Sequence, residues 1–491
     1  MILTLLLIIP LIGGVVSWLV AYRSVLASRW VAFVAVAIDF VIALVIWVGD
    51  PVKIGAGVRL AEVNIPWVKQ FGLNYHLALD GLNLLMVLLT GLLAMVAVAC
   101  SWREIEERVG QFHLALLTLV AAVLGTFMAF DLFLFFLFWE GMLIPMYFLI
   151  AIWGHENRHY AATKFFLFTF ISGMFILLGV LGLFAYSGKG TFDYDVLMGT
   201  NMPALAGLLL MLSMLFGFAV KLPAVGLHTW LPDAHTQAPT AGSVILAGLL
   251  LKTGAYAMLR FAIPLFPDAS ATIAPVAMAL GAAGVLYGAV LAYAQEDFKR
   301  MVAYTSVSHL GFVLLGIYAG TEIALQGAVM GMICHGLATG ALFVIAGLVQ
   351  ERMGTREFSR LGGLWSVTPK LGGFTLFFAL ASLGLPGMGN FIAEILVLLG
   401  AFAVSPVLAI IAAFGLIASV VYSLWLVQRA MYGPKAYPVQ PVDLNVREVA
   451  ILGVLAALLL WLGLHPQPVF DTAKQPLRAV EQVMPIGDQH E

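Results

Sequence analysis

The chain has 491 residues, of which 62% are hydrophobic and only 10% are charged, and its mean hydropathy is +1.02. Ordinary soluble domains carry about 25% charged residues, so this composition excludes a soluble globular protein and indicates a protein that crosses a membrane many times. The formal charge of −2 and the lack of a basic cluster argue against nucleic-acid binding. Cys100 and Cys334 lie in apolar runs without the spacing of a disulfide framework or a zinc site.

Fourteen apolar segments are each long enough to cross about 30 Å of hydrocarbon. They begin near residues 2, 30, 77, 112, 132, 164, 204, 239, 271, 301, 322, 371, 406 and 447. The first lacks the basic start and the small-residue cleavage pattern of a signal peptide, so we expect it to be retained. The sequence therefore predicts an all-α polytopic membrane protein with about fourteen transmembrane helices and both termini on one side.

Lysine and arginine are unevenly distributed between alternate connections, with fifteen residues on one side and seven on the other. Because an excess of Lys and Arg marks the cytoplasmic side, both termini are expected to be periplasmic. The Ala, Val and Leu-rich segments fit a bacterial inner membrane. The larger group is Arg23, Arg29, Arg103, Arg108, Arg158, Lys164, Lys299, Arg300, Arg352, Arg356, Arg360, Lys370, Arg429, Lys435 and Arg447, and the smaller group is Lys53, Arg59, Lys69, Lys189, Arg260, Lys474 and Arg478.

Four ionisable residues fall near the middle of four different predicted helices. At 1.5 Å per residue from the nearest helix end, Lys252 lies about 20 Å deep, and Glu140 and His309 lie about 14 Å deep. His335 lies midway along its segment. An isolated histidine in a span more often bonds a neighbouring helix than carries protons. A central lysine costs about 3 kcal/mol, so the four together indicate a functional site rather than packing.

Two proline-containing segments predict broken helices, the seventh and the twelfth. Pro223, in AVKLPAVG, cannot donate to the carbonyl of Ala219, and Lys221 stands beside it. Pro386, in ASLGLPGMGNFIAEILVL, precedes Glu394. Non-helical backbone is tolerated at this depth only where protein buries it or water reaches it, so both breaks predict a hydrated interior.

The two breaks share a P-x-x-G frame 163 residues apart, beginning at residues 223 and 386. A repeat of roughly 165 residues would hold five spans, an odd number, so its two copies would have opposite membrane topology, as in many transporters. This frame predicts an inverted repeat.

Polar residues also occur at the predicted ends of spans. His228, Asp233 and His235, in HTWLPDAH, are expected at the cytoplasmic mouth of the seventh and eighth spans, where they either take up protons or only shape the loop. Asp80, in LDGLN, is expected to cap the third span at its outer end.

Three long motifs resemble the antiporter-like subunits of respiratory complex I, the proton-pumping NADH:quinone oxidoreductase. They are KLPAVGLHTWLPDAHTQAPTAGSVILAGLLLKTGAYAMLRF, EDFKRMVAYTSVSHLGF and SLGLPGMGNFIAEILVL. The fourteen-span layout extends the resemblance over almost the whole chain. Within this family the sequence most resembles subunit M, the counterpart of mitochondrial subunit 4. The related subunits L and N carry a lysine where this chain has Glu394, and no long lateral helix follows the last span as in subunit L.

The resemblance implies two inverted five-helix bundles, residues 112–260 and 271–431, preceded by helices in residues 1–111 and followed by a last helix and a short polar tail in residues 432–491. It also implies a proton relay through the membrane, driven by quinone reduction elsewhere in the complex. In this relay Glu140 and Lys221 form a coupled ion pair, Lys252 is the central carrier, His309 and His335 form the bridge, and Glu394 is the exit-side carrier.

The chain itself is not expected to carry out redox chemistry, although it would be a subunit of a translocase. It has no Gly-rich dinucleotide fingerprint and no cysteine set for an iron–sulfur cluster. No cofactor or metal is therefore expected here. Flavin, iron–sulfur clusters and quinone are expected on partner subunits. The expected partners are lipids and other membrane-arm subunits, including the L and N types, and not nucleic acid.

Three alternatives remain from the sequence. The same module could serve an Mrp-type cation/proton antiporter or a membrane-bound hydrogenase, against which Glu394 argues. His309 and His335 could instead hold a haem between two spans, which the surrounding Lys and Glu residues disfavour. An inert scaffold would leave the cost of the buried charges unexplained.

Overall fold

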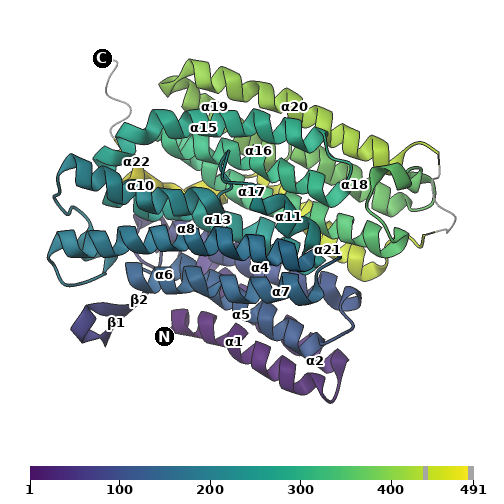
Figure 1. Ribbon diagram of the computed structural model, residues 1–491, viewed down its shortest axis with the longest axis horizontal. Helices are drawn as coiled ribbons and strands as arrows, with labels where there is room; N and C mark the ends of the chain where they lie inside the picture. The colour runs from purple at the N-terminus through teal and green to yellow at the C-terminus, as the bar shows by residue number, and fades with distance from the viewer. Residues whose placement is uncertain (435–440, 485–491) are drawn as a thin grey trace.

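The computed structural model describes residues 1–434 and 441–484. Two parts of the last predicted division, residues 435–440 with Lys435 and residues 485–491, therefore lie outside the described residues. Within this part, thirteen helical segments are long and apolar enough to cross a membrane. They run side by side along the long axis, with α1 and α2 near one edge and α20 at the other (Figure 1). The predicted multi-pass all-α architecture is confirmed.

The thirteen segments follow the predicted order along the chain. They are α1 (Ile2–Ala21), α2 (Val25–Gly49), α4 (Gly81–Glu104), α5 (Val109–Met128), α6 and α7 (Leu132–Trp153), α8 (Arg158–Ser187), α10 (Ala204–Lys221), α12 to α14 (Thr240–Leu265), α15 (Pro267–Tyr293), α16 (Phe298–Ala319), α17 (Glu322–Met353), α20 (Pro406–Met431) and α21 (Val446–Leu464).

Both predicted helix breaks are confirmed. The seventh span is α10 followed, after an irregular stretch at Pro223, by α11 (Trp230–Gln237). The twelfth predicted segment is divided at Pro386 into α18 (Pro369–Ser382) and α19 (Gly389–Val404), and each helix is too short to cross the membrane alone. This divided segment, added to the thirteen spans, accounts for the fourteen segments that the sequence predicts. The expectation that Pro223 leaves the carbonyl of Ala219 free is wrong, because the N–H of Ala224 donates to it at 2.9 Å.

The fifth and eighth spans are also irregular, which the sequence did not predict. The fifth consists of α6 (Leu132–Gly141) and α7 (Leu143–Trp153), so it is interrupted at Met142, two residues after Glu140. The eighth contains two π-helical stretches, η2 (Leu246–Leu250) and η3 (Met258–Ala262), among α12 (Thr240–Ile245), α13 (Leu251–Ala257) and α14 (Ile263–Leu265). π-turns are rare and occur frequently at functional sites, and here they flank the turn that carries Lys252.

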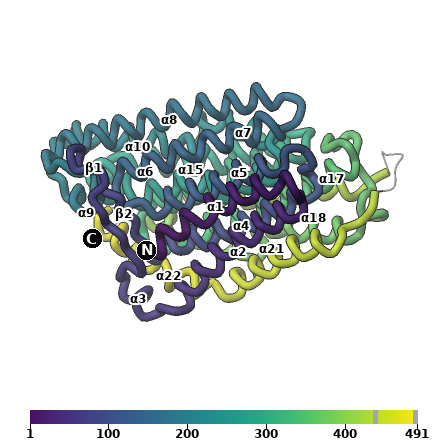
Figure 2. The backbone as a smooth tube through the Cα atoms, turned by 90° about the horizontal axis from the view of Figure 1, so that it is seen from below, coloured from purple at the N-terminus to yellow at the C-terminus, as the bar shows by residue number. Residues whose placement is uncertain are grey.

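One end of the molecule, which we call the hairpin end, is built from short elements that link the helices. An antiparallel hairpin joins β1 (Ala61–Val68) through η1 (Lys69–Phe71) to β2 (Leu73–Leu79). Nearby lie the start of α1, α3 (Pro51–Ala56), α9 (Tyr194–Leu197) and the end of α22 (Gln467–Val483), as Figure 2 shows. The short 3₁₀ helices η4 (Phe358–Arg360) and η5 (Leu364–Ser366) lie between α17 and α18. We call the end opposite the hairpin, where α17 meets α18, the basic end.

The hairpin end corrects two expectations. The third span does not begin near residue 77, because residues 73–79 form β2, which pairs antiparallel with β1 and is partly exposed at residues 73–75 and buried at residues 76–79. Asp80 caps α4 as predicted, since its carboxylate accepts the N–H groups of Leu82 and Asn83. The polar tail contains the helix α22, which buries Val469, Ala473 and Leu477 at helical spacing.

The core lies where five spans of the described chain are mostly buried. In α4, α5, the α12–α14 span, α16 and α17, between 72% and 100% of the most apolar stretch is buried, whereas in α1, α2, α8 and α20 the share is only 28% to 39%. Three of these five core spans carry Lys252, His309 and His335. The predicted mid-membrane residues therefore lie inside the protein rather than against lipid. The inverted repeat and its divisions stay a prediction.

Candidate functional site

Lys252 lies at the centre of the core and has one side-chain partner. Its side chain is fully buried on α13, and Nζ lies 2.6 Å from Nδ1 of His335 on α17. The ammonium also donates to the carbonyl of Ala247 in the π-helical stretch before it. A charged lysine only donates hydrogen bonds, so Nδ1 of His335 accepts from it, and the proton of a neutral His335 then lies on Nε2.

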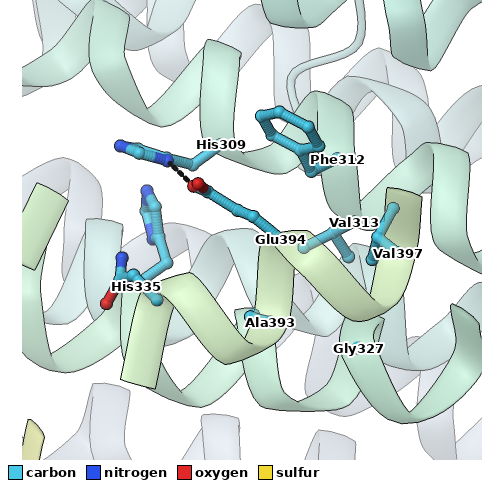
Figure 3. Close-up of a pocket in the computed structure, with 10 residues that line it drawn as sticks. His309, Phe312, Val313, Gly327, His335, Ala393, Glu394 and Val397 are labelled. Carbon is cyan, nitrogen blue, oxygen red and sulfur yellow. Dashed lines mark hydrogen bonds and ion pairs between the residues drawn. The ribbon is translucent and has the colours of Figure 1, made fainter. Parts of the chain in front are cut away.

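Glu394 and His309 form a second contact at the break of the twelfth span. Nδ1 of His309, on α16, lies 2.9 Å from Oε1 of Glu394 on α19. Nε2 of the same ring lies 3.0 Å from Oγ of Ser382 and 3.1 Å from Oη of Tyr422. Figure 3 shows the side chains of His309, His335 and Glu394 converging from three helices. Because of the break, Ser382 at the end of α18 and Glu394 in the first half of α19 both contact the imidazole of His309.

A glycine in this break makes room for the carboxylate. Gly384 has φ +77°, a left-handed conformation that suits glycine. A Cβ at this position would lie 2.8 Å from Oε2 of Glu394. Any larger residue would therefore strain the backbone and displace the Glu394 side chain.

The two contacts do not join into one hydrogen-bonded chain. The ring centroids of His309 and His335 are 5.6 Å apart, but both nitrogens of His309 already face Glu394, Ser382 and Tyr422. Within residues 1–434 and 441–484, no hydrogen bond links the two imidazoles. Four of the six predicted relay residues thus form two adjacent pairs, Lys252–His335 and His309–Glu394.

Glu140 and Lys221 lie in one neighbourhood but not in contact. Lys221 is 1% exposed at the C-terminal end of α10, where the helix dipole favours a cation. Its Nζ lies 5.2 Å from the ring centre of Trp139 and 5.9 Å from that of Phe165. Glu140 follows Trp139 and is partly exposed, and the described residues show no ion pair between its carboxylate and Lys221. The coupled pair stays a prediction.

The three polar residues of HTWLPDAH are not gathered in one cluster. Asp233 is partly exposed and pairs with Nζ of Lys164 at 2.6 Å. His235 is fully buried, stacks on Phe343 with ring centres 4.4 Å apart, and has no hydrogen-bond partner at either ring nitrogen in the described part of the chain. His228 is 3% exposed at the break of the seventh span. Their role in proton uptake stays a prediction.

A third lysine is fully buried, and the sequence reasoning missed it. Lys299 was counted among the cytoplasmic connections, but it lies unexposed in the first turn of α16 and donates to the carbonyl of Ala238. Nearby, Glu104 accepts hydrogen bonds from both N–H and Oγ of Thr240. No sequence signal marks Lys299, since a charged residue in a first helical turn can point outward or inward.

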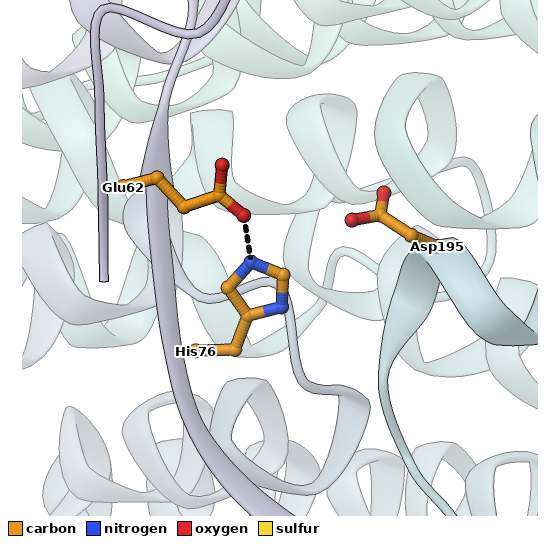
Figure 4. Close-up of side chains that lie close together, drawn as sticks. All are labelled: Glu62, His76 and Asp195. Carbon is orange, nitrogen blue, oxygen red and sulfur yellow. Dashed lines mark hydrogen bonds and ion pairs between the residues drawn. The ribbon is translucent and has the colours of Figure 1, made fainter. Parts of the chain in front are cut away.

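A polar cluster at the hairpin end was also missed. His76 is 1% exposed, and its Nδ1 lies 2.8 Å from Oδ2 of Asp193. Its Nε2 lies 2.9 Å from Oε1 of Glu62, as drawn in Figure 4. Ligand atoms of Glu62, His76 and Asp195 all lie within 4.8 Å of one another, a spacing that could suit a metal ion. However, Arg59 pairs with Glu62 at 2.6 Å and with Asp195 at 2.5 Å, so a guanidinium already compensates both carboxylates.

The His76 cluster predicts that the hairpin is held less firmly at high pH. Burial opposes the charged imidazole, but the hydrogen bonds and charge of Asp193, with the hydrogen bond to Glu62, outweigh burial and raise the pKa of His76. Because this pKa is higher in the folded than in the unfolded state, the stabilisation is fully present below about pH 6.5 and is lost as the pH rises through the folded-state value.

We expect amide hydrogen exchange in residues 61–79 to be slower at about pH 6 than at about pH 9, after correction for the intrinsic rate. His76→Gln should remove most of this difference. Protection that is independent of pH in the native chain would contradict the role of the imidazolium.

With the geometry described, comparison with known proteins identifies the family. Residues 129–421 match the sequence profile of the family described as NADH:quinone oxidoreductase/Mrp antiporter, TM. The chain is 50% identical over 497 aligned residues to NADH-quinone oxidoreductase subunit M of Pseudomonas aeruginosa, with 98% of each chain covered. It is 48% identical over 498 residues to the protein of the same name from Escherichia coli strain K12, again with 98% of each chain covered.

Solved structures agree with this family. A chain of respiratory complex I from Thermus thermophilus with bound NADH is 31% identical, with a TM-score of 0.88 and coverage of 98% of this chain and 100% of that one. A chain of the Mrp complex from Dietzia sp. shares the fold, with a TM-score of 0.86 at 22% identity, covering 97% of this chain and 98% of that one. The chain therefore belongs to the NADH:quinone oxidoreductase/Mrp antiporter family of membrane subunits, and within it to the subunit M group.

Proposed function

We propose that this chain is a proton-translocating subunit of the membrane arm of an NADH:quinone oxidoreductase. The observation that carries the proposal is the placement of two contacting pairs of ionisable residues, Lys252–His335 and His309–Glu394, side by side in the buried core. Such groups are costly inside a membrane and mark ion pathways by default. The names of the subunit M relatives support the same assignment.

In this proposal Glu140 and Lys221 start each transfer. A nearby carboxylate stabilises an ammonium through its charge, so Lys221 holds its proton while Glu140 is close. When quinone reduction elsewhere in the complex moves Glu140 away, the proton passes toward Lys252. From there it travels through the histidines to Glu394, which releases it on the far side.

The redox reaction takes place on other chains in this proposal. An iron–sulfur cluster requires about four cysteine ligands, and this chain has only two cysteines, neither of them paired with the other. Partner subunits therefore bind flavin, clusters and quinone. This chain contacts other membrane-arm subunits, including the L and N types, and lies in a bacterial inner membrane with both termini periplasmic. The Lys and Arg excess in the connections at the basic end supports that orientation.

A second candidate is a subunit of an Mrp-type cation/proton antiporter or of a membrane-bound hydrogenase. The fold shared with the Mrp complex favours this alternative. The carboxylate of Glu394 disfavours it, because many Mrp-type subunits resemble subunits L and N in carrying a lysine in the twelfth span.

The test is to tag the C-terminus, extract the protein in a mild detergent and assay the purified assembly for NADH:quinone reduction. The proposal expects this activity together with flavin and iron–sulfur signals from partner chains. A stable assembly without the activity, but with sodium-dependent proton exchange or hydrogen evolution, would overturn the complex I assignment.

The position of Glu140 gives a sharper prediction about coupling. A Cβ on Gly173 would lie 1.7 Å from Oε1 of Glu140, so Gly173→Ala must move the Glu140 carboxylate without removing any titratable group from the chain. We expect proton uptake per enzyme to fall by roughly tenfold, as for Glu140→Gln, because misplaced transfer groups lose rate steeply.

The measurement is proton uptake and NADH:quinone reduction in membrane vesicles with equal amounts of assembled complex. Gly207→Ala is the matched control, because its methyl group would meet only Met202, at 3.4 Å. Equal activity of the Gly173 and Gly207 variants would show that the position of Glu140 does not matter.

A further inference from the structure

The series of relay residues is interrupted between His335 and Glu394. Nδ1 of His335 is occupied by Lys252, and both nitrogens of His309 are occupied by other groups. A proton that leaves His335 must depart from Nε2, which has no hydrogen-bond partner among the described residues. Something must therefore connect Nε2 of His335 to the carboxylate of Glu394.

A small cavity lies at this interruption. Its lining includes His335, Glu394, Asn390, Gly331 and Val313, and its volume is about 10 Å³. That is close to the smallest space that holds one water molecule inside a protein, provided that two to four polar groups bind it.

Three lining residues each carry a buried polar atom without a partner in the described chain. These atoms are Nε2 of His335, Oδ1 of Asn390 and Oε2 of Glu394. Their side chains belong to residues that are 2%, 3% and 5% exposed. Buried polar atoms are almost always hydrogen-bonded, to protein or to ordered water, so three of them around a cavity of this size indicate one ligand that both donates and accepts.

We propose that this cavity binds one water molecule, held by His335, Asn390 and Glu394, and that Asn390 is a positioning residue of the relay. The inference rests on the proposed function and changes it in one respect, because His309 then holds the Glu394 carboxylate and does not itself carry the proton. Asn390 acts through the water, because its amide oxygen accepts one hydrogen and thereby turns the other toward Glu394.

The proton transfer through this water balances. Lys252 gives a proton to Nδ1 of His335, and the N–H bond at Nε2 breaks as an O–H bond forms on the water. The water then loses a different proton to Oε2 of Glu394. Lys252 becomes neutral, Glu394 becomes a carboxylic acid, and the water is unchanged. His335 is left neutral with its proton on Nδ1, and it returns to its starting tautomer when it loses that proton and gains one at Nε2.

Gly331→Ala is the most direct test, because it fills the cavity and leaves every polar group in place. A Cβ on Gly331 would lie 3.2 Å from Cγ2 of Val313 and 3.7 Å from Cβ of Ala393, so a small shift of Val313 accommodates it. The matched control is Gly340→Ala, on the same helix as Gly331. The added methyl group would lie 3.6 Å from Leu93, and Gly340 does not line the cavity.

In vesicles that contain the assembled complex, Gly331→Ala should lower NADH-driven proton uptake by about tenfold, the loss expected when a buried hydrogen bond on the transfer path is left unmade. Gly340→Ala should change proton uptake by less than about twofold. If the two variants pump equally well, the water site is wrong.

Asn390 variants test the site independently of cavity size. Asn390→Leu should slow proton uptake and increase its solvent deuterium isotope effect, because proton transfer becomes limiting. Asn390→Ser, which keeps an oxygen, should recover part of the rate. An unchanged isotope effect in Asn390→Leu would indicate a purely structural role and overturn the proposal.

The outcomes separate this inference from the proposed function. Loss of pumping in Lys252→Met and Glu394→Gln, with normal pumping in Gly331→Ala and Asn390→Leu, would overturn only the water site. Normal pumping in Lys252→Met and Glu394→Gln would overturn the relay itself.

Discussion

Replacing Lys252 with methionine should abolish proton pumping while the complex still assembles. Methionine has a similar length but no ammonium, and it suits a fully buried site whose only side-chain partner among the described residues is His335. Because a positioned proton carrier contributes roughly a hundredfold or more to transfer rates, we expect NADH-driven proton uptake to fall by at least about tenfold. Quinone reduction should slow together with proton uptake, because the two processes are tightly coupled in the proposed mechanism.

The measurement is proton uptake and NADH:quinone reduction in vesicles, normalised to the amount of assembled complex on a native gel. Lys53→Met is the matched control, since Lys53 is exposed and pairs with the nearby Asp50, at 2.7 Å. An assembled Lys252→Met complex with unchanged uptake and reduction would show that protons take another path.

Substitutions of Glu394 should separate the subunit M chemistry from that of the related lysine-bearing subunits. Glu394→Gln keeps the size of the side chain but cannot bind and release a proton, so we expect a loss of proton uptake of about tenfold or more. Glu394→Lys places a group without an acceptor opposite Nδ1 of His309, now 2.9 Å from Oε1 of Glu394. We therefore expect altered turnover rather than tolerance.

The control for both substitutions is Glu357→Gln, because Glu357 is exposed and lies away from the relay. Rates should be measured over a range of pH, since an exit-side acid affects the pH profile whereas a structural residue does not. Wild-type turnover and an unchanged profile in Glu394→Lys would favour a mechanism in which a lysine serves equally well, as in subunits L and N.

The sequence alone determined the features that depend on local chemistry. Hydropathy placed the segment starts at residues 2, 132, 204, 322 and 406, where the structure has them. Proline indicated the breaks at Pro223 and Pro386, because its ring and missing N–H disfavour the interior of a helix. The cost of a charge in hydrocarbon singled out Lys252 and Glu140 before any contact was known.

Only the tertiary structure decided which groups meet. The core helices α16 and α17 are apolar on nearly all sides, so they have no amphipathic stripe to indicate which face turns toward which neighbour. The 2.6 Å contact between Lys252 and His335 joins residues 83 positions apart. It depends on packing and on an adjacent π-turn that periodicity does not reveal.

The remaining features share that cause. The hairpin around His76, the burial of Lys299 and the 5.6 Å separation of the His309 and His335 rings all follow from how distant segments pack. Local composition sets where a helix crosses the membrane and where it breaks. The free energy of moving a side chain into the membrane, and the effect of proline on a helix, each depend on the individual residue. The rotation of each helix and the partner of each buried group are set by close packing of the whole chain, which no single segment encodes.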